Sequence, residues 1–454
     1  MDTKSKLDYR NKIILAPMVR VGTLPMRLLA LGYGADIVYT EEIIDWKFLR
    51  SLRRINDALG TIDYLDKSDG TVVFRTCAKE KDKVVVQLGT CDPERALKVA
   101  KMIENDIAGI DINMGCPKEF SLKGGMGAAL LSKPCKAKLI LSMLVKNLSI
   151  PVTCKIRVLE NIDDTLRLVQ DLASTGISAL GVHGRTISER PQHQNRNETI
   201  RMIAENLTIP VIANGGSREI ESYKDIFKFK EECGSSSVMV ARVAQGNCSI
   251  FRKQGMEDLD TVITKYLKCA VDYDNSPSNT KYCVQNMLKS LQETPRGKKF
   301  LECQTLEQIC AIWNMDKYCH SKQLDYQLKG NLGRREIRPD LFNPTPKRLK
   351  TDLEDSVNEM QCAFIRANYI KDTELPKTRL LSWCNKNKYD NPKYETINED
   401  KLFRSVVTVM NQKYTSTFWE KNKKFAEQGA ALVALFYLGL VNEDVLSKNG
   451  SILR

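Results

Sequence analysis

The sequence has no long hydrophobic run, no paired cysteines and little histidine. Its apolar stretch Gly429–Leu440 is well short of the roughly 20 residues that a membrane-spanning helix needs, and the N-terminus lacks the apolar core of a signal peptide. None of the fourteen cysteines belongs to a Cys-x-x-Cys pair, and only three histidines are present. We therefore expect no membrane contact, no disulfide framework and no metal site. A reducing cytoplasmic setting is expected, with a nuclear pool as the alternative.

The length and the charge indicate a multidomain protein with a polyanionic partner. A chain of 454 residues is too long for one ordinary domain, so two or three folded units are expected. Lysine and arginine exceed aspartate and glutamate by 69 to 56, which leaves a formal net charge of +13. This excess favours RNA or an acidic membrane surface as a partner, and charge alone does not choose between them.

A repeating strand and helix pattern extends from the start of the chain to about residue 250. Each unit has a short apolar, β-branched run, a polar or glycine-containing turn and a stretch with helical spacing. The eight runs are Ile13–Met18, Ile37–Ile43, Val84–Gly89, Gly109–Cys116, Val152–Val158, Ala179–Arg185, Pro210–Gly216 and Ser237–Ala244. Eight such strands predict an α/β fold of the (β/α)8 TIM barrel type over residues 1–250, with parallel strands buried on both faces.

Two gaps between these strands are wide enough for added elements. The first leaves room for a hairpin, with Thr71–Thr76 as one of its strands, and the second for a glycine-rich loop at Lys123–Ala128. After the barrel, the helical spacing of Val262–Tyr273 and Tyr282–Leu291 predicts a small helical domain over residues 251–335. Residues 336–361 hold several prolines, many charges and few large apolar side chains, which is typical of a linker.

The last region, residues 362–445, predicts a compact α-β-β-β-α domain. Helical and strand patterns follow one another there in that order. The segments are Lys377–Lys386, Tyr394–Thr396, Phe403–Met410, Lys413–Phe418 and Glu420–Leu438.

Functional groups stand at the carboxyl ends of all eight predicted strands. In a TIM barrel the site lies at this end, so these residues are expected to meet at the barrel mouth. They are Met18, Glu42, Gln87, Asn113 with Cys116, Lys155 with Arg157, His183 with Arg185, Asn214 with Gly215 and Gly216, and Ala241 with Arg242. Packing alone does not explain such a ring, which therefore predicts a ligand site.

The turns after the last two strands predict a phosphate site. Gly215 and Gly216 leave backbone N–H groups accessible, and Arg242 follows the neighbouring strand. Lys155 and His183 are expected at the same mouth, where an anionic reduced flavin gains from cationic or hydrogen-bonding groups. Flavin mononucleotide is therefore the expected cofactor.

Cys116 stands at the end of the fourth predicted strand, in Asn113-Met-Gly-Cys-Pro117. A thiol with a reference pKa of about 8.5 is mostly protonated at neutral pH, so it can donate a proton to a carbanion-like centre as hydride arrives from elsewhere. A nucleophilic role stays open as an alternative, although no histidine adjoins Cys116 in the sequence.

Taken together, several motifs resemble the tRNA-dihydrouridine synthase family. They are Ala16-Pro-Met18, Asn113-Met-Gly-Cys-Pro117, the loop that begins at Lys123, Lys155-Ile-Arg157, Val182-His-Gly-Arg185 and Ile212-Ala-Asn-Gly-Gly216. The resemblance covers the barrel and the helical region, and it implies that the helical region binds tRNA. It further implies that NADPH reduces FMN and that the reduced flavin passes hydride to the 5,6-double bond of a uracil. A stacked uracil must be swung out of the tRNA to reach the barrel mouth.

The resemblance also implies roles for single residues, with Cys116 as the proton donor. The positions that match the family's flavin contacts are Pro17, Met18, Glu42, Gln87, Lys155, His183, Asn214, Gly215, Gly216, Ala241 and Arg242. Asn113, Arg157 and Arg185 match positions that hold the target base and its phosphates. Ala241 departs from the family pattern, because many members have glycine there and a methyl group narrows the approach of a ligand to the backbone.

The α-β-β-β-α domain resembles a double-stranded-RNA-binding domain. Such domains recognise A-form RNA through phosphates and 2′-hydroxyls, with lysines at the start of the last helix. The lysines that match this role are Lys421, Lys423 and Lys424, and Lys413 extends the surface. Glu427 at the motif's last basic position and Phe418-Trp419 before the helix depart from the pattern. A protein-interaction domain with a lysine-rich face is the alternative.

A synthase barrel joined to this domain resembles the eukaryotic branch that modifies uridine 20 in the D-loop of tRNA. We therefore predict a monomeric, NADPH-dependent enzyme that reduces uridine to 5,6-dihydrouridine, with hydride from FMN, a proton from Cys116 and contacts to the tRNA D-arm. Two alternatives stay open: a flavin oxidoreductase for a small molecule, and an RNA-binding regulator without catalytic activity.

Overall fold

The computed structural model describes residues 7–329, 357–399 and 402–452, which form two compact units. The first unit contains the described residues up to Met287 together with those from Tyr318 to residue 329. The second contains Leu288–Lys317 and the described residues from 357 onwards. No helix in these described ranges is long and apolar enough to span a membrane.

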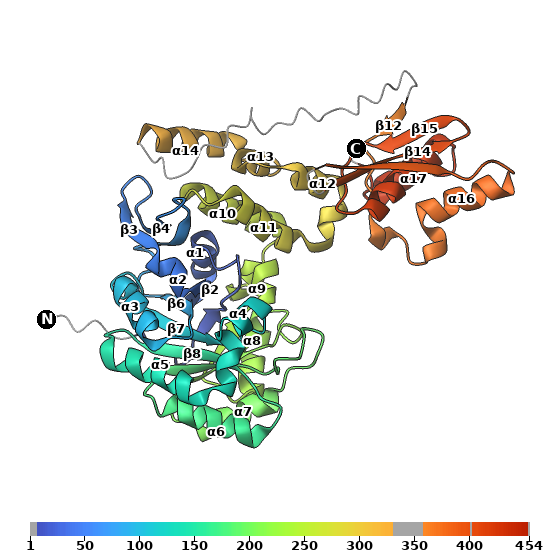
Figure 1. The fold of residues 1–454 in the computed structure, drawn as a ribbon. Coiled ribbons are helices and arrows are strands. Elements are labelled where there is room, and N and C mark those ends of the chain that lie inside the picture. The colour runs from blue at the N-terminus through green and yellow to red at the C-terminus, as the bar shows by residue number, and fades with distance from the viewer. Residues whose placement is uncertain (1–6, 330–356, 400–401, 453–454) are drawn as a thin grey trace. The chain divides into compact units, whose positions relative to one another are not determined.

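Eight parallel strands close a barrel in the first unit (Figure 1). Their order around the barrel is β1-β11-β10-β9-β8-β7-β6-β2. The bounds are β1 Ile13–Leu15, β2 Ile37–Ile44, β6 Val84–Gly89, β7 Gly109–Met114, β8 Val152–Arg157, β9 Ala179–His183, β10 Val211–Asn214 and β11 Ser237–Val240. Each strand lies on one of the eight predicted runs, which confirms the TIM barrel. Several strands end earlier than predicted, because their last residues turn into the loops of the barrel mouth.

Helices surround the barrel strands, as Figure 1 shows for α3 and α5 to α8. The helical elements are α1 Leu24–Tyr33, α2 Asp45–Leu49, α3 Pro93–Ile103, α4 Glu119–Lys123, η1 Gly127–Ser132, α5 Pro134–Asn147, α6 Ile162–Ala173, α7 Asn197–Asn206, α8 Tyr223–Glu232, α9 Arg242–Gly246 and η2 Cys248–Phe251. Helix α6 illustrates why they form, because Asn161 Oδ1 accepts the first N–H groups and Leu168 and Leu172 are buried beneath.

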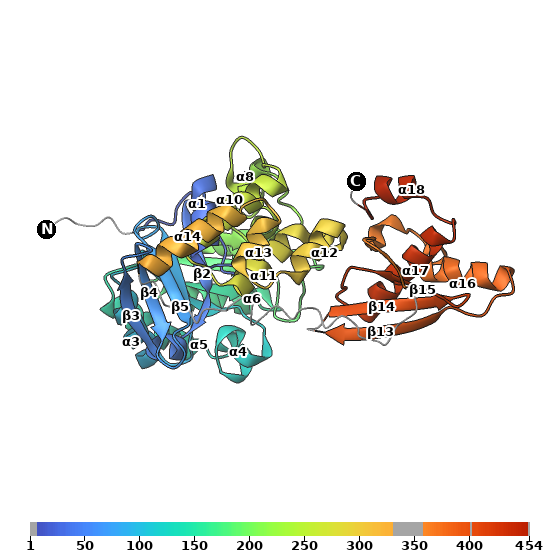
Figure 2. The same ribbon diagram turned by 90° about the horizontal axis from the view of Figure 1, so that it is seen from above.

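A three-stranded antiparallel sheet is inserted between β2 and β6 (Figure 2). Its strands are β3 Ser51–Asn56, β4 Thr61–Asp66 and β5 Val72–Cys77. Only β5 was predicted from the sequence. Strand β3 carries charged residues at its centre, so it lacks a clear apolar alternation, and its Arg53 is instead bound by Asp106, with Nε to Oδ2 at 2.7 Å.

Three further helices complete the first unit. They are α10 Leu259–Asp272, α11 Pro277–Leu288 and α14 Asp316–Leu328. Helix α10 packs against α1, and Tyr326 Oη of α14 donates to the Asp272 carbonyl at 2.8 Å. The remaining elements of the predicted helical region, η3 Lys289–Glu293, α12 Pro295–Glu302 and α13 Leu306–Ala311, belong to the second unit. The helical region is therefore shared between the two units.

The second unit has a four-stranded sheet in the order β12-β15-β14-β13. Its strands are β12 Val357–Met360, β13 Lys393–Glu399, β14 Leu402–Val409 and β15 Gln412–Ser416, and its other elements are η4 Arg366–Asn368, η5 Asp372–Glu374, α16 Pro376–Lys386, α17 Lys423–Tyr437 and α18 Glu443–Lys448. Residues of α16 and α17 pack with the sheet in one core. The predicted α-β-β-β-α order is confirmed.

Two elements of this unit were not predicted. Strand β12 lies within the residues 336–361 that were assigned to the linker, and α18 follows the predicted last helix. Four residues alternate too briefly to indicate a strand, and β12 forms because it pairs in parallel with β15, from Val357 with Lys413 to Met360 with Ser416. Residues 336–356 of the predicted linker lie outside the described ranges.

A buried ion pair joins α1 to the residues that follow β5. The Arg27 guanidinium donates to Glu80 from Nε to Oε2 at 2.8 Å and from Nη2 to Oε1 at 2.6 Å. It also donates to the carbonyl oxygens of Gly22 and Arg75. The two charged side chains are 2% and 0% exposed. Saturating the guanidinium with acceptors offsets much of the cost of burying the two charges.

We expect Glu80→Gln to lower the free energy of unfolding by about 3 kcal/mol or more, because it leaves the Arg27 charge buried without a counterion. Urea denaturation followed by tryptophan fluorescence measures the change. Glu198→Gln is the matched control, since its partner Arg201 lies on the surface, and we expect a loss below about 1 kcal/mol. Equal losses in both variants would contradict the role assigned to the buried pair.

Candidate active site

The strand register brings the predicted residues together at the barrel mouth. Glu42 pairs with Gln87 across β2 and β6, and Asn113 pairs with Lys155 across β7 and β8. His183 of β9 pairs with Arg157 on one side and with Asn214 on the other. Pro17 and Met18 follow β1 in a partly buried turn, where the Met18 carbonyl accepts the N–H groups of Val21 and Gly22.

The backbone around Cys116 is held from two sides. Asn113 Oδ1 accepts the N–H groups of Gly115 at 2.9 Å and Cys116 at 3.0 Å. Arg157 Nε donates to the Gly115 carbonyl at 2.8 Å. On the other side, the Cys116 carbonyl accepts the N–H of Ala128 at 3.1 Å. Asn113 and Arg157, which were predicted to hold substrate, therefore also shape the loop that carries the thiol.

A glycine lets the η1 segment approach Cys116 closely. Gly127 has φ +56°, and a Cβ there would lie 2.4 Å from Ser121 Oγ and 2.8 Å from the Cys116 carbonyl oxygen. Any other residue would push the segment away from the thiol.

The surroundings of Cys116 favour the thiol over the thiolate. Burial raises the pKa of Cys116 above its usual range, and the neighbouring Glu42 carboxylate raises it further. Burial also raises the pKa of Glu42, which a hydrogen bond with Cys116 partly opposes. A protonated thiol suits a proton donor and disfavours the nucleophilic alternative. Glu42 was predicted as a flavin contact, and the structure places it beside Cys116.

Lys155 and Asp111 are a buried pair of opposite charge. Burial and then Arg157 lower the pKa of Lys155 to about 8, while Asp111 and Cys116 act in the opposite direction. Burial raises the pKa of Asp111 to about 6, although hydrogen bonds from Gln87 and Thr153 favour its charged form. Both groups are therefore charged at neutral pH. Asp111 was missed in the sequence, where the only signal is a carboxylate in the middle of a buried strand.

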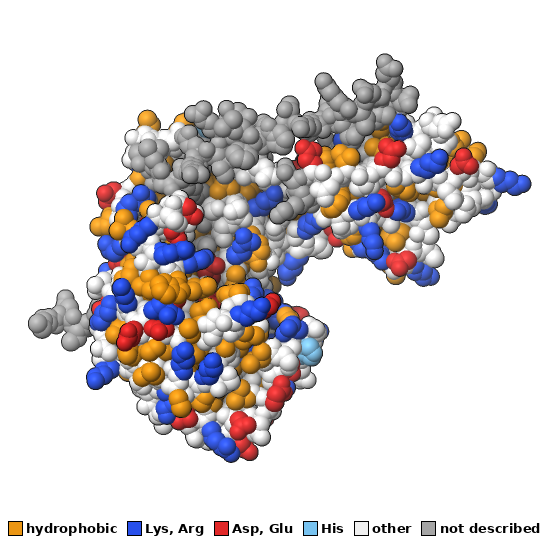
Figure 3. All heavy atoms as spheres, viewed as in Figure 1, with side chains coloured by type: hydrophobic (Ala, Val, Ile, Leu, Met, Phe, Trp, Pro, Cys, Tyr) orange, Lys and Arg blue, Asp and Glu red, His pale blue; other side chains and the backbone are white. Residues whose placement is uncertain are grey.

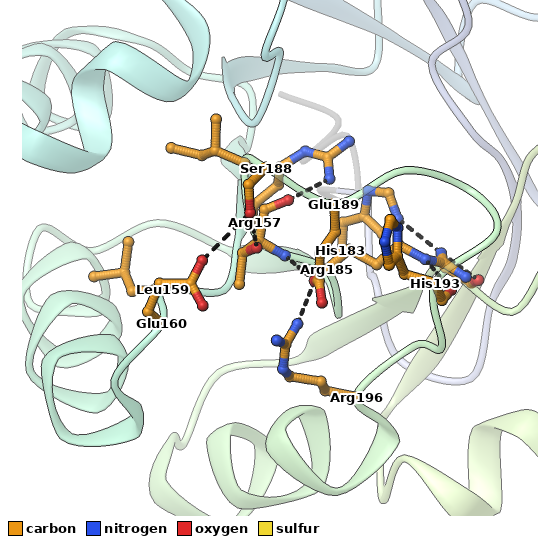
Figure 4. A network of polar contacts seen from close by, with 12 residues as sticks. Arg157, Leu159, Glu160, His183, Arg185, Ser188, Glu189, His193 and Arg196 are labelled. Atoms are coloured by element: carbon orange, nitrogen blue, oxygen red, sulfur yellow. Dashed lines mark hydrogen bonds and ion pairs between the residues drawn. The ribbon is translucent and has the colours of Figure 1, made fainter.

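His183 is held neutral by burial and by its cationic neighbours, and Figure 4 shows Arg185 beside it. Burial first, and then Lys155, Arg157 and Arg185, lower the pKa of His183. Arg185 Nη1 lies 3.1 Å from His183 Nε2. An arginine can only donate, so Nε2 accepts and the ring proton is on Nδ1, where it can be donated to a ligand.

Arg185, which was predicted to hold the base or its phosphates, is buried and donates to backbone carbonyls. Its side chain is 1% exposed, Nε donates to the His193 carbonyl at 2.8 Å, and Nη1 donates to the Gly215 carbonyl at 2.8 Å. These bonds support His183 and the Gly215 turn from behind. The predicted strand extended to Arg185, but β9 ends at His183 and Arg185 lies in the loop that follows.

A small pocket, partly open to solvent, lies where β10 and β11 end. The predicted phosphate residues Asn214, Gly215, Gly216, Ala241 and Arg242 all line it. The first-turn amides of α9, at Arg242 and Val243, have no carbonyl partner within the helix, which favours an anion there.

A phosphate-bearing cofactor fits this pocket. Gly215 has φ +120°, and a Cβ there would lie 1.9 Å from Asn195 Oδ1 and 3.0 Å from the His183 ring. Only glycine therefore leaves the turn open at this point. Asn214 Nδ2 donates to the Met239 carbonyl at 2.8 Å, which fixes β10 to β11 beneath the turn.

The predicted RNA-contacting lysines lie around the start of α17. Asn422 Oδ1 accepts the N–H of Phe425 at 2.9 Å, so the helix begins at Lys423, and Lys424 is its second residue. Lys421 precedes the helix and donates to Gln292. Figure 3 shows that Lys and Arg side chains are spread among acidic ones over the face in view. Lys413 lies in β15.

Glu427 and Phe418 have structural partners. The Glu427 carboxylate accepts from Lys377 and lies 3.8 Å from Lys423 Nζ, so it neutralises part of the charge at the start of α17. Phe418 is 4% exposed and so belongs to the interior. These contacts account for both departures from the RNA-binding pattern.

Comparison with known proteins identifies both parts of the chain. The sequence profile of a family described as Dihydrouridine synthase (Dus) matches residues 14–314, and a profile described as Double-stranded RNA binding motif matches residues 376–438. The chain is 40% identical over 293 residues to tRNA-dihydrouridine(20) synthase of Schizosaccharomyces pombe, over 62% of this chain and 60% of that protein. It is 36% identical over 324 residues to the protein of that name from Saccharomyces cerevisiae, over 67% of this chain and 84% of that protein.

Both relatives' names include NAD(P)+. A crystal structure of a tRNA-dihydrouridine(20) synthase dsRBD domain is 46% identical, covering 19% of this chain and 92% of that chain with a TM-score of 0.18.

We expect Glu42→Gln to lower the pKa of Cys116, because it removes the carboxylate that opposes thiolate formation. Iodoacetamide reacts with the thiolate, so the alkylation of Cys116 should begin at a lower pH than in the wild type. Peptide mass spectrometry across a pH series measures this for Cys116 alone, and the exposed Cys135 in the same sample is the internal control. An unchanged pH profile for Cys116 would show that Glu42 does not act on the thiol.

Proposed function

Because the chain belongs to the dihydrouridine synthase family, we propose that it reduces uridine to 5,6-dihydrouridine in tRNA. The observation that carries the proposal is the Cys116 thiol, which is kept protonated at the barrel mouth by burial and by Glu42. The names of both yeast relatives specify position 20, so we propose uridine 20 of the D-loop as the target.

We propose FMN as the cofactor and NADPH as its reductant. A bound FMN would supply the hydride for the 5,6-double bond. The pocket at Gly215 and Arg242 would hold its phosphate. The Nδ1 proton of His183 and the Lys155 ammonium would bind electron-rich atoms of the flavin, and Gln87 would bind its polar edge.

The proton step follows from the groups around Cys116. Reduction of a carbon–carbon double bond requires one hydride and one proton, so the thiol proton of Cys116 balances the reaction. Lys155 and Arg157 are close enough for the charge of Cys116 to affect their own pKa values, and they would therefore stabilise the thiolate that remains. Asn113 and Arg157 keep the thiol in place while the uracil enters.

The double-stranded RNA binding motif would supply affinity for the tRNA D-arm, while the barrel supplies the chemistry. Lys423 and Lys424 at the start of α17 are the residues that we propose to contact phosphates. All fourteen cysteines are free thiols, which supports our proposal of a cytoplasmic location. We propose that the protein works as a monomer.

The cofactor assignment predicts that the purified protein is yellow, with a two-banded flavin spectrum. NADPH should bleach the spectrum, and tRNA that lacks dihydrouridine should restore it in the absence of oxygen. Anaerobic stopped-flow absorbance measures both steps. Restoration by a small oxidant but not by tRNA would favour the small-molecule oxidoreductase. A colourless protein that still binds RNA would favour the inactive regulator.

We expect Cys116→Ala to keep the flavin and its reduction by NADPH but to lose turnover on tRNA by about 100-fold or more, because the proton donor is absent. Turnover is measured by counting dihydrouridine in tRNA by mass spectrometry. Cys135→Ala, at an exposed position, is the matched control and should retain full activity. Persistent turnover in Cys116→Ala would place the proton donor elsewhere. Base-resolved mapping of dihydrouridine in cells that lack the gene tests the assignment to position 20.

A further inference from the structure

A buried carboxylate in β7 lies next to residues assigned above to the cofactor. Asp111 is 1% exposed. Gln87 Nε2 donates to Asp111 Oδ2 at 2.9 Å, and Thr153 Oγ1 donates to Asp111 Oδ1 at 2.7 Å. Both carboxylate oxygens therefore have a hydrogen-bond partner, and the one that faces Gln87 Nε2 can only accept, an arrangement that suits an ionised group. Nothing in the proposed chemistry uses this charge directly.

From Asp111, the hydrogen bonds run in one direction towards the loop of Cys116. Because Gln87 Nε2 donates to Asp111, the other end of the amide, Oε1, faces Asn113. Asn113 Nδ2 donates to Gln87 Oε1 at 3.1 Å. Asn113 Oδ1 then accepts the N–H groups of Gly115 and Cys116. The chain thus joins one flavin contact, one substrate contact and the backbone of the proton donor.

The two ends of this chain determine the orientation of the amides between them. A backbone N–H can only donate, and an ionised carboxylate can only accept. If either the Gln87 or the Asn113 amide were turned over, two donors or two acceptors would face each other in a buried place. An unpaired buried polar group costs about 1–3 kcal/mol. The charge on Asp111 is therefore sufficient to select one orientation of both side chains.

We propose that Asp111 is a positioning residue of the active site, which orients Gln87 and Asn113 and, through Asn113, holds the loop that carries Cys116. Asp111 acts through these neighbours. The inference rests on the proposed function, because Gln87 is there a flavin contact and Cys116 the proton donor. On this proposal, the buried charge of Asp111 keeps the loop that carries Cys116 ordered.

Asp111→Asn tests this role with almost no change in shape. An asparagine can present either its oxygen or its nitrogen to Gln87, so only the backbone end of the chain still favours one direction, and the Gln87 and Asn113 amides are held less firmly. We expect hydrogen exchange at the Gly115 and Cys116 amides to become faster by up to about tenfold, the effect of losing one hydrogen bond. Mass spectrometry of peptides that contain these amides measures the exchange, and the measurement needs no bound flavin.

In the presence of FMN, the same variant should bind the flavin more weakly. With saturating tRNA, the reduced flavin of this variant should be reoxidised more slowly than that of the wild type. The KM for tRNA should be unchanged, because the tRNA-binding surface is intact. If Asp111 served stability alone, the variant would have a changed melting temperature but would not show a lower kcat at an unchanged KM.

Thr153→Val is the matched control. It removes the other hydrogen bond to Asp111 but keeps the contact with Gln87. Because the lost bond favoured the charged form of Asp111, wild type and variant are compared at about pH 9, where the carboxylate stays charged and the exchange of the two loop amides should match the wild type. If Asp111→Asn does not fold, Gln87→Met interrupts the chain one step later and should give the same faster exchange.

Two results would overturn the inference. One is wild-type exchange at Gly115 and Cys116 in Asp111→Asn or Gln87→Met, and the other is equal acceleration in Thr153→Val. If the wild-type protein binds no FMN, the proposed function fails, but the exchange measurement still decides whether Asp111 orders the loop.

Discussion

Strand β1 is only three residues long, yet it pairs with β2 on one side and with β11 on the other, and these two pairings close the barrel. Closure brings the carboxyl ends of eight parallel strands to one opening. Residues as far apart in the sequence as Glu42, Cys116 and His183 then share a mouth. The strand register sets the spacing of these side chains, so long insertions such as the β3–β5 sheet leave their arrangement intact.

Two arginines near the mouth, Arg157 and Arg185, are bound by backbone carbonyls and not by carboxylates. Arg157 donates to the carbonyls of Gly115 and Thr186, and Arg185 donates to those of His193 and Gly215. Backbone oxygens satisfy the hydrogen bonds of a guanidinium but leave its full charge in place. The site is therefore prepared for an anionic ligand, and its binding would relieve the mutual repulsion of the cations.

The barrel was predictable because each buried strand is an apolar run that ends in functional groups. The site residues followed from the rule that such groups meet at the carboxyl ends of the strands. The features that were not predicted depend on partners that are far away in the sequence. Strand β3 forms with arginines that are paired to acidic residues elsewhere, and β12 forms only by pairing with β15. No pattern in the local sequence indicates that Arg185 donates to backbone carbonyls or that Asp111 is bonded to Gln87 and Thr153.

The chain passes between the two units more than once, since it leaves the first at Leu288 and returns to it at Tyr318. The segment between these points is bound to the RNA-binding domain through the ion pair of Lys298 and Glu420, which are 1% and 6% exposed. A single proteolytic cut after α14 would therefore separate the RNA-binding domain from Leu288–Lys317, the segment of its own unit that carries Lys298. Loss of the Lys298 charge alone would leave the Glu420 carboxylate buried without its counterion, so this segment and the domain are best kept in one fragment.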